Sequence, residues 1–340
     1  MKYLFELNHP KHYYQFKYIM QLLKQDGHEI FVIARDKDVL LKILDEEKVK
    51  YSIFGEHQKK MINKIFGTIP ILVNYLRIVN KINPDVIISK ASFYGTFTAW
   101  IIGRKSVIFP DSEVVKVTNR YVAPIATKII TPATFGLDFG AKHIRVNGFF
   151  EDCYLSPAVF KPDVNVLEQY GLKRPYAIFR FVGWYANHDV GNKGFTASQI
   201  KDMISAAEKN MTVYISSEKP LPVDFEKYRL QIPSSLMHHA LAFADLYLGD
   251  SQTMATEAAL LGTPAIRSNS FVGPNDMTNF KVLQEKYNLL FNIADFHDVL
   301  RKLGELAENS QKQEWIDKQR QYFLHVGDTN RQITEILENM

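Results

Sequence analysis

The sequence has a single cysteine, Cys153, among its 340 residues. One cysteine cannot form an intramolecular disulfide, and it excludes every zinc site that needs several thiolates. The chain also lacks an uninterrupted apolar run of the ~20 residues that a membrane-spanning helix needs. Its first residues, MKYLFELNHP, lack the apolar core and the small-residue cleavage site of a signal peptide. These absences predict a cytoplasmic protein.

Internal repeats and low-complexity tracts are absent as well. Hydrophobic residues make up 46% of the chain and charged residues 23%, which is ordinary for a soluble globular protein. The net charge of +4 is unevenly spread, because residues 1–155 contain 22 Lys and Arg but only 15 Asp and Glu. A basic first half suits either an anionic partner or a plain solvated surface. No nucleic-acid motif accompanies it, so we expect no nucleic-acid partner.

Short apolar runs alternate with helix-period segments along the whole chain. Buried parallel strands are continuous apolar runs, and each needs a crossover helix to reach its neighbour. The alternation therefore predicts doubly wound α/β domains. The predicted strands are 3–7, 30–34, 51–54, 86–89, 107–109, 128–131, 176–181, 212–216 and 246–249, and the predicted helices are 16–25, 39–47, 71–82, 198–209, 253–261 and 296–307.

Residues 148–175 interrupt this alternation with three prolines and two glycines, as a linker does. At ~150 residues per domain the length also fits two domains. We therefore predict an N-terminal domain at 1–155 and a C-terminal domain at 156–325. A last segment, 326–340, is expected to form a helix that packs back on the first domain. Ligands are expected at the carboxyl ends of the strands, in a cleft that the two domains face.

The segment 246–267, LYLGDSQTMATEAALLGTPAIR, contains the most chemical information. It predicts a strand, a turn capped by Ser251, a helix that begins near Gln252 and Thr253, and a Gly-Thr-Pro stop. The first N–H groups of a helix have no intrahelical partner, so such an end binds phosphate without a lysine. Glu257 lies about one and a half turns further on, where a carboxylate can accept the hydroxyls of a ribose. An ordinary capped helix has the same local pattern.

The pattern Gly-Asp-Ser-x-Thr-Met-x-x-Glu-Ala-Ala-x-Leu-Gly-Thr-Pro-Ala in this segment resembles the nucleotide-sugar motif of GT-B fold proteins. Those proteins include the UDP-N-acetylglucosamine 2-epimerases and the N-acetylglucosaminyltransferase of peptidoglycan synthesis. The chain is similar over nearly its whole length to a bacterial and archaeal family catalogued as domain of unknown function 354. The earlier blocks of that resemblance are Asn8-His9-Pro10-Lys11-His12, Gly27-His28-Glu29, Ala34-Arg35-Asp36 and Asn83-Pro84-Asp85.

The resemblance implies the GT-B fold, two Rossmann-like domains facing a cleft, and a nucleoside diphosphate sugar, UDP-linked, as the substrate. It assigns the donor diphosphate to Ser251, Gln252 and Thr253, and the ribose to Glu257. The base would lie against backbone near Ile232. Relatives commonly have Gly-Gly where this chain has Gln-Thr, so side chains here narrow the diphosphate site.

A second donor-side group is the segment 180–192, RFVGWYANHDVGN, which follows the first strand of the second domain. Gly183 permits close approach of backbone to a ligand, and Arg180 can reach the donor phosphates or sugar. Trp184 and Tyr185 can stack on a sugar face or pack in the core. Asn187, His188 and Asp189 are further candidates for contacts with the donor.

Two groups after strands of the first domain are candidates for the catalytic base. A histidine has a pKa suited to accepting a proton from an acceptor hydroxyl near neutral pH, and His9 and His12 both follow the first strand. Asp111 and Glu113 follow another strand, and either could be the base or could orient a histidine. We predict that His9 or His12 is the base and that Asp111 and Glu113 support it, with surface or helix-capping roles as the alternatives for all four.

A sugar-nucleotide epimerase or hydrolase is the alternative enzyme, and a non-catalytic nucleotide-sugar-binding protein is the alternative class. The epimerases resemble this chain around Asn119-Arg120, but they carry acids just before that pair, where this chain has Lys116 and Val117. They also carry an aspartate where this chain has Lys90. Elimination and re-addition of UDP needs such carboxylates to move protons. We therefore predict a glycosyltransferase of cell-surface polysaccharide or glycolipid synthesis.

No histidine or cysteine spacing suggests a metal site, and GT-B enzymes generally need no metal, so we expect no cofactor besides the substrate. The acceptor is expected to be a saccharide or a lipid-linked molecule. Residues 57–81 carry five Lys and Arg and no acid, with apolar residues between them. Such a stretch can rest on the inner face of the plasma membrane, or it can be an ordinary crossover helix.

Overall fold

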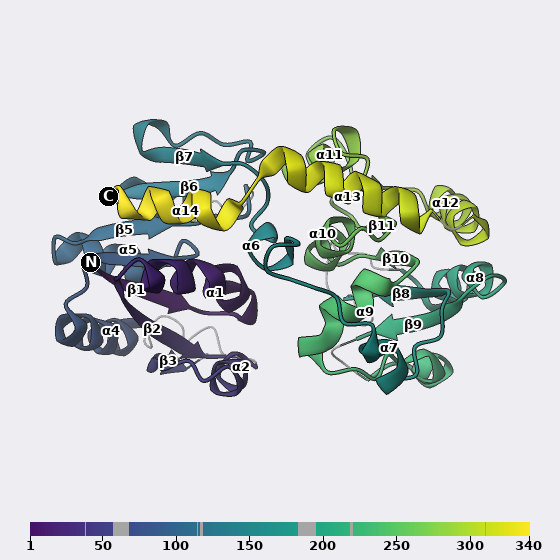
Figure 1. Ribbon diagram of the computed structural model, residues 1–340, viewed down its shortest axis with the longest axis horizontal. Helices are drawn as coiled ribbons and strands as arrows, with labels where there is room; N and C mark the ends of the chain where they lie inside the picture. The colour runs from purple at the N-terminus through teal and green to yellow at the C-terminus, as the bar shows by residue number, and fades with distance from the viewer. Residues whose placement is uncertain are drawn as a thin grey trace. The chain divides into compact units, whose positions relative to one another are not determined.

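The computed structural model describes residues 1–37, 39–56, 68–113, 115, 118–182, 195–217, 220–309 and 311–340. The chain divides into two compact units (Figure 1). Unit 1 consists of Met1–Tyr154 and Gly327–Met340, and unit 2 is Leu155–Val326. The boundary thus lies one residue from the one predicted between residues 155 and 156. None of the helices in the described parts of the chain combines the length and apolar character that a bilayer crossing requires.

Unit 1 is built on a seven-stranded parallel sheet in the order β3-β2-β1-β4-β5-β6-β7. Helices α1, α2 and α14 pack on one face of the sheet, and α4 and α5 pack on the other. The strands are β1 (Lys2–Leu7), β2 (Glu29–Asp36), β3 (Ser52–Glu56), β4 (Val86–Ser89), β5 (Lys105–Ile108), β6 (Lys128–Pro132) and β7 (His143–Val146). The helices are α1 (Pro10–Gln25), α2 (Leu40–Glu46), α4 (Thr68–Ile82), α5 (Phe93–Ile101), η1 (Thr118–Val122), η2 (Ala123–Ile125), η3 (Gly140–Lys142) and α14 (Thr329–Glu338), while α6 (Asp152–Leu155) spans the unit boundary.

Helix α14 returns the end of the chain to unit 1, where it lies beside α1 (Figure 1). Its Ile333 and Leu337 are fully buried in the same core as β1 and α1. The hydroxyl of Tyr3 in β1 donates a hydrogen bond to the carbonyl of Leu337 (2.9 Å). The last helix is therefore part of the unit 1 core.

Unit 2 is built on a five-stranded parallel sheet in the order β12-β11-β10-β8-β9. Helices α8 and α12 bury their apolar faces together on one side of it. The strands are β8 (Tyr176–Arg180), β9 (Thr212–Ser216), β10 (Leu246–Gly249), β11 (Ala265–Arg267) and β12 (Leu290–Asn292). The helices are α7 (Asn165–Gln169), α8 (Ala197–Ala207), η4 (Val223–Tyr228), η5 (Ser234–Leu236), α9 (Met237–Phe243), α10 (Gln252–Leu260), α11 (Thr278–Glu285), α12 (Phe296–Glu308) and α13 (Lys312–Val326).

Two features differ from the sequence prediction. Helix α5 was not predicted, because its sequence FYGTFTAWI is rich in aromatic and β-branched residues that favour strands. Tertiary packing overrides this preference: Gly95 lets the helix approach the sheet so closely that a Cβ there would meet Glu6 Oε2 at 2.5 Å. The predicted linker also begins too early, since Phe149 and Phe150 are buried in unit 1.

Candidate functional site

Helix α10 begins at Gln252 and is capped by Ser251, as the sequence predicts. Ser251 is the N-cap residue, and its hydroxyl oxygen accepts a hydrogen bond from the N–H of Met254 (3.4 Å). The N–H groups of Gln252 and Thr253 find no acceptor among the residues described here. Unsatisfied donors and the positive end of the helix dipole coincide at this point. The helix end can therefore accept the oxygens of a diphosphate.

Arg180 lies next to this helix end because β8 and β10 are neighbours in the sheet. Its backbone pairs with Gly249, and its carbonyl accepts the N–H of Asp250 (3.1 Å). A Cβ at position 249 would meet that carbonyl oxygen at 2.4 Å, so only glycine fits here. The Arg180 guanidinium donates to Ser216 Oγ (3.1 Å) at the end of β9. A cation thus stands at the carboxyl edge of the sheet, beside the turn into α10.

Glu257 is held on the buried side of α10 by a histidine that sequence reasoning did not assign to the site. His238 Nε2 in α9 lies 3.2 Å from Glu257 Oε1, and both side chains are largely buried. Ile232 precedes η5, which leads directly into α9. The described candidate residues of unit 2 therefore lie at the end of β8, on α10 and in the segment that leads into α9.

Four charged side chains meet at the carboxyl edge of the unit 1 sheet. Lys11 Nζ lies 2.8 Å from Glu151 and 4.0 Å from Asp111, while Lys90 Nζ lies 3.2 Å from Asp111. The four residues, Lys11, Lys90, Asp111 and Glu151, come after β1, β4, β5 and β7 in that order. The carboxyl ends of these parallel strands lie along one edge of the sheet. The two lysines hold the pKa of Asp111 well below its usual range, against the effect of burial. The two lysines therefore favour the charged form of Asp111.

Lys90 is the most enclosed member of this cluster, with a side chain that is only 3% exposed. Its ammonium group donates to Gln15 Oε1 (2.8 Å) and lies 4.2 Å from the centre of the Phe150 ring. Burial lowers the pKa of Lys90, and the Asp111 charge opposes that effect. Sequence reasoning noted this lysine only as a replacement for an acid, and it missed Lys11 and Glu151. The position of these three residues directly after strands could have marked them as site candidates. Which of them pair depends on the order of the strands in the sheet.

Both candidate histidines accept a backbone hydrogen bond on Nδ1. His9 caps α1 and accepts from the N–H of Lys11 (3.1 Å), and His12 accepts from the N–H of Asn8 (3.2 Å). A neutral ring in this arrangement carries its proton on Nε2 and presents a donor. Burial, followed by the charge of Lys90, lowers the pKa of His12 to about 3, so its ring is neutral near pH 7. In this geometry His12 donates a hydrogen bond through Nε2 rather than accepting a proton there.

The remaining predicted residues fall in two groups: Glu113, which the structure describes, and residues outside the described ranges. Glu113 Oε1 accepts the N–H of Gly136 (2.6 Å), which ties it to the loop after β6. Gly183, with Trp184, Tyr185 and the polar residues up to 192, lies outside the described residues, as do Lys116, Val117 and residues 57–67. In the described ranges, no group of three or more His, Cys, Asp or Glu side chains is arranged to hold a metal ion.

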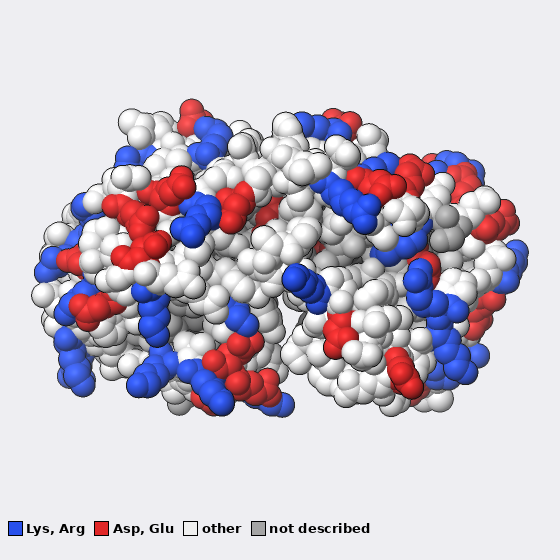
Figure 2. Space-filling model, viewed as in Figure 1, with Lys and Arg blue, Asp and Glu red and all other residues white. Residues whose placement is uncertain are grey.

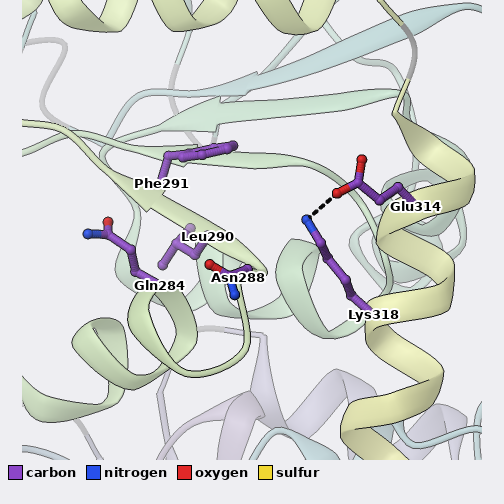
Figure 3. Close-up of a pocket in the computed structure, with 6 residues that line it drawn as sticks. All are labelled: Gln284, Asn288, Leu290, Phe291, Glu314 and Lys318. Carbon is purple, nitrogen blue, oxygen red and sulfur yellow. Dashed lines mark ion pairs between the residues drawn. The ribbon is translucent and has the colours of Figure 1, made fainter.

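A pocket of about 370 Å³ in unit 2 lies apart from these residues (Figure 3). It opens beside Leu290, the first residue of β12, whereas Ser251 lies at the carboxyl edge of the sheet. Glu314 and Lys318 of α13 form an ion pair (2.7 Å) at its side. None of the predicted site residues lines this pocket, which is lined by Gln284, Asn288, Leu290, Phe291, Glu314 and Lys318.

Comparison with solved structures shows the same fold at low sequence identity. UDP-GlcNAc 2-epimerase of Neisseria meningitidis, bound to UDP-GlcNAc, is 12% identical with a TM-score of 0.71. MurG of Acinetobacter baumannii is 16% identical with a TM-score of 0.62, and Alr3699/HepE of Anabaena, in complex with UDP and glucose, is 15% identical with a TM-score of 0.63. In all three pairs 100% of each chain is covered. These likenesses show that the chain has the GT-B fold.

No curated protein sequence matches the chain. The sequence family described as "Protein of unknown function (DUF354)" matches residues 2–324, which is nearly the whole chain. The chain therefore belongs to the DUF354 family, and its α/β units have the GT-B fold.

Proposed function

We propose that this protein is a glycosyltransferase that takes a sugar from a UDP-linked donor. The acceptor is a saccharide or a lipid-linked molecule of cell-surface polysaccharide or glycolipid synthesis. The observation that carries the proposal is the start of α10, where two unsatisfied N–H groups precede a buried carboxylate on the same helix. Two of the similar structures contain such ligands, UDP-GlcNAc in the Neisseria meningitidis epimerase and UDP with glucose in Alr3699/HepE.

In this proposal unit 2 binds the donor. The N–H groups of Gln252 and Thr253, with the Ser251 cap, bind the diphosphate, and Arg180 adds positive charge beside it. Glu257 accepts hydrogen bonds from the ribose hydroxyls, and backbone near Ile232 contacts the base. Helix-end donors and an arginine stabilise the charge that develops on the leaving diphosphate, so the step needs no metal.

Unit 1 supplies the acceptor side of the proposed reaction. The acceptor hydroxyl donates a hydrogen bond to the Asp111 carboxylate, and its proton passes to a carboxylate or histidine of this group as the oxygen bonds to the anomeric carbon and the bond to UDP breaks. His12 donates through Nε2 to orient the acceptor, since its Nδ1 is already occupied. His9 and Glu113 border this group, and they stay candidates for the same proton transfer.

The epimerase alternative is favoured by the fold and disfavoured by the residues. The epimerases carry an acid after the fourth strand, and this chain has Lys90 at that position. The lysine is buried and paired with Asp111 (3.2 Å). A cation in this place cannot remove a proton from a sugar carbon. Conversion of a UDP-sugar without any acceptor is the result that supports an epimerase, and tight binding without turnover supports a non-catalytic binding protein.

Thermal unfolding with a panel of nucleoside diphosphates and their sugars tests the donor site. A ligand at about 100 times its Kd is expected to stabilise the fold by ~2.7 kcal/mol. We expect this shift with UDP or a UDP-sugar, and we expect Glu257→Ala to lose it. Glu305→Ala, which removes an exposed carboxylate from α12, is the control and keeps the shift. No shift with any nucleotide contradicts the proposal.

We also propose that unit 1 contacts an anionic membrane through the α4–α5 surface, defined by the exposed residues of α4 and α5. Phe93, Phe97 and Trp100 form a stacked row along α5, with ring centres 5.0 and 5.9 Å apart. Trp100 is 60% exposed, and Ile69 on α4 is 69% exposed. Such aromatic and apolar side chains enter the headgroup region of a bilayer.

Charge around the α4–α5 surface supports the same partner. Residues 68–85 and 93–105, which contain α4, α5 and the turns after them, have four Lys and Arg and a single acid, Asp85. By contrast, acidic and basic side chains are interspersed on the face of unit 1 that carries α1 and α14 (Figure 2). Each basic residue near an anionic surface contributes about 1 kcal/mol of attraction. An anionic bilayer therefore complements the surface in both charge and polarity.

Sedimentation with lipid vesicles tests this contact. The protein is expected to bind phosphatidylglycerol vesicles and to bind them less at high salt. It is expected not to bind neutral phosphatidylcholine vesicles. Trp100→Glu is expected to reduce the bound fraction several-fold, because a charge replaces the inserted ring. Leu324→Glu, at a 78% exposed site of α13 in unit 2, is the matched control. Equal binding by Trp100→Glu and the unmodified protein counts against the contact.

A further inference from the structure

We infer that His238 positions the Glu257 carboxylate so that the donor site distinguishes a ribose from a sugar that lacks the 2′- and 3′-hydroxyls. The inference rests on the proposed function, because the ribose belongs to the proposed donor. His238 Nε2 lies 3.2 Å from Glu257 Oε1, and the side chains are 17% and 10% exposed. Sequence reasoning assigned no role to this histidine.

A largely buried carboxylate needs hydrogen-bond partners to offset its desolvation. The contact to His238 joins α9 to α10 and gives the carboxylate a donor from outside its own helix. A donor at Oε1 restricts rotation of the carboxylate plane. A diol that approaches then meets acceptors of fixed direction, and binding loses less entropy than with a freely rotating group.

The His238 ring is itself held in place by the segment that opens unit 2. Phe160 packs edge-on against it, with ring centres 6.1 Å apart and planes at 85°. The adjacent His239 accepts the N–H of Asp163 on Nδ1 (2.9 Å) and also packs on Phe160 (4.9 Å). The two histidines therefore have different hydrogen-bond partners: His239 contacts Asp163, and His238 contacts the carboxylate.

The position of α9 gives the contact a second consequence. Helix η5 leads directly into α9, and the loop before η5 contains Ile232, where the proposal places the nucleobase. His238 is the second residue of α9. One short element thus connects the base loop to the ribose carboxylate.

Calorimetric titration with UDP and with 2′,3′-dideoxyuridine 5′-diphosphate tests this role. The second ligand keeps the base and the diphosphate but lacks both ribose hydroxyls. We expect His238→Ala to weaken UDP binding about tenfold, as loss of one charge-assisted hydrogen bond does, and to change binding of the dideoxy ligand less than about twofold. His238→Gln, which restores an N–H donor, is expected to recover part of the affinity for UDP.

Two further variants separate positioning from folding. His239→Ala removes a neighbouring ring from the same helix and is expected to keep the preference for UDP over the dideoxy ligand. In the Glu257→Ala background, His238→Ala is expected to cause no further loss, because both act through one carboxylate. Equal losses for the two ligands in His238→Ala overturn the positioning role, as does an unchanged affinity for UDP. Absence of UDP binding by the unmodified protein overturns the proposed function and this inference together.

Discussion

Replacing Arg267 by methionine is expected to destabilise unit 2 by about 3–5 kcal/mol, as loss of one partner from a buried ion pair does. Arg267 ends β11 and is fully buried. Its guanidinium donates to both oxygens of Asp276 (2.6 and 3.0 Å) and to Asn292 Oδ1 (2.8 Å). It also lies 3.6 Å from the centre of the Phe280 ring. Without it, Asp276 stays buried at 3% exposure with no counter-charge.

The same substitution is expected to weaken nucleotide binding, because this network holds the loop beside the proposed donor site through Asn269, whose Oδ1 accepts from Arg267 (3.4 Å). Asn269 in that loop donates to the carbonyl of Asp250 (3.0 Å), one residue before the Ser251 cap. Urea unfolding gives the loss of stability, and titration with UDP gives the loss of affinity. Arg267→Met combined with Asp276→Asn removes the orphaned charge, so we expect it to recover much of the stability. If Arg267→Met alone is as stable as the unmodified protein, the buried ion pair does not have the stabilising role expected here.

Replacing Lys312 is expected to raise the stability of the protein near neutral pH. Lys312 begins α13 and is 8% exposed, and its Nζ donates to Thr263 Oγ1 (2.6 Å) in the Gly-Thr-Pro turn. Burial lowers its pKa from 10.5 to about 7, and the Asp245 charge only partly opposes this. At ~1.4 kcal/mol per pKa unit, the buried amine costs several kcal/mol when it must be protonated.

The sign of the pH dependence follows from the two pKa values. Between pH 7 and 10.5 the unfolded chain binds the proton and the folded protein releases it, so stability rises with pH in this window. Below about pH 7 both states are protonated and the full cost is present. We expect Lys312→Met and Lys312→Gln to flatten the rise, which denaturant unfolding from pH 6.5 to 10 measures. A variant with the same slope as the unmodified protein shows that Lys312 is not its source.

The sequence by itself determined the features that depend on neighbouring residues. Continuous apolar runs predict buried parallel strands, and β1, β4, β9 and β10 begin and end within a residue of the predicted bounds. Serine before the α10 helix predicts a cap, and Ser251 is that cap. These signals are local because hydrogen bonds within one turn, or burial of one strand, decide them.

Only the tertiary structure decided which side chains meet. Lys90 and Asp111 are brought together because β4 and β5 are neighbours, and Glu151 reaches Lys11 from more than a hundred residues away. His238 and Glu257 likewise lie on helices that a sequence pattern cannot place side by side. Strand order and helix packing follow from burial of the whole core, so contacts between distant segments are not encoded in any local pattern.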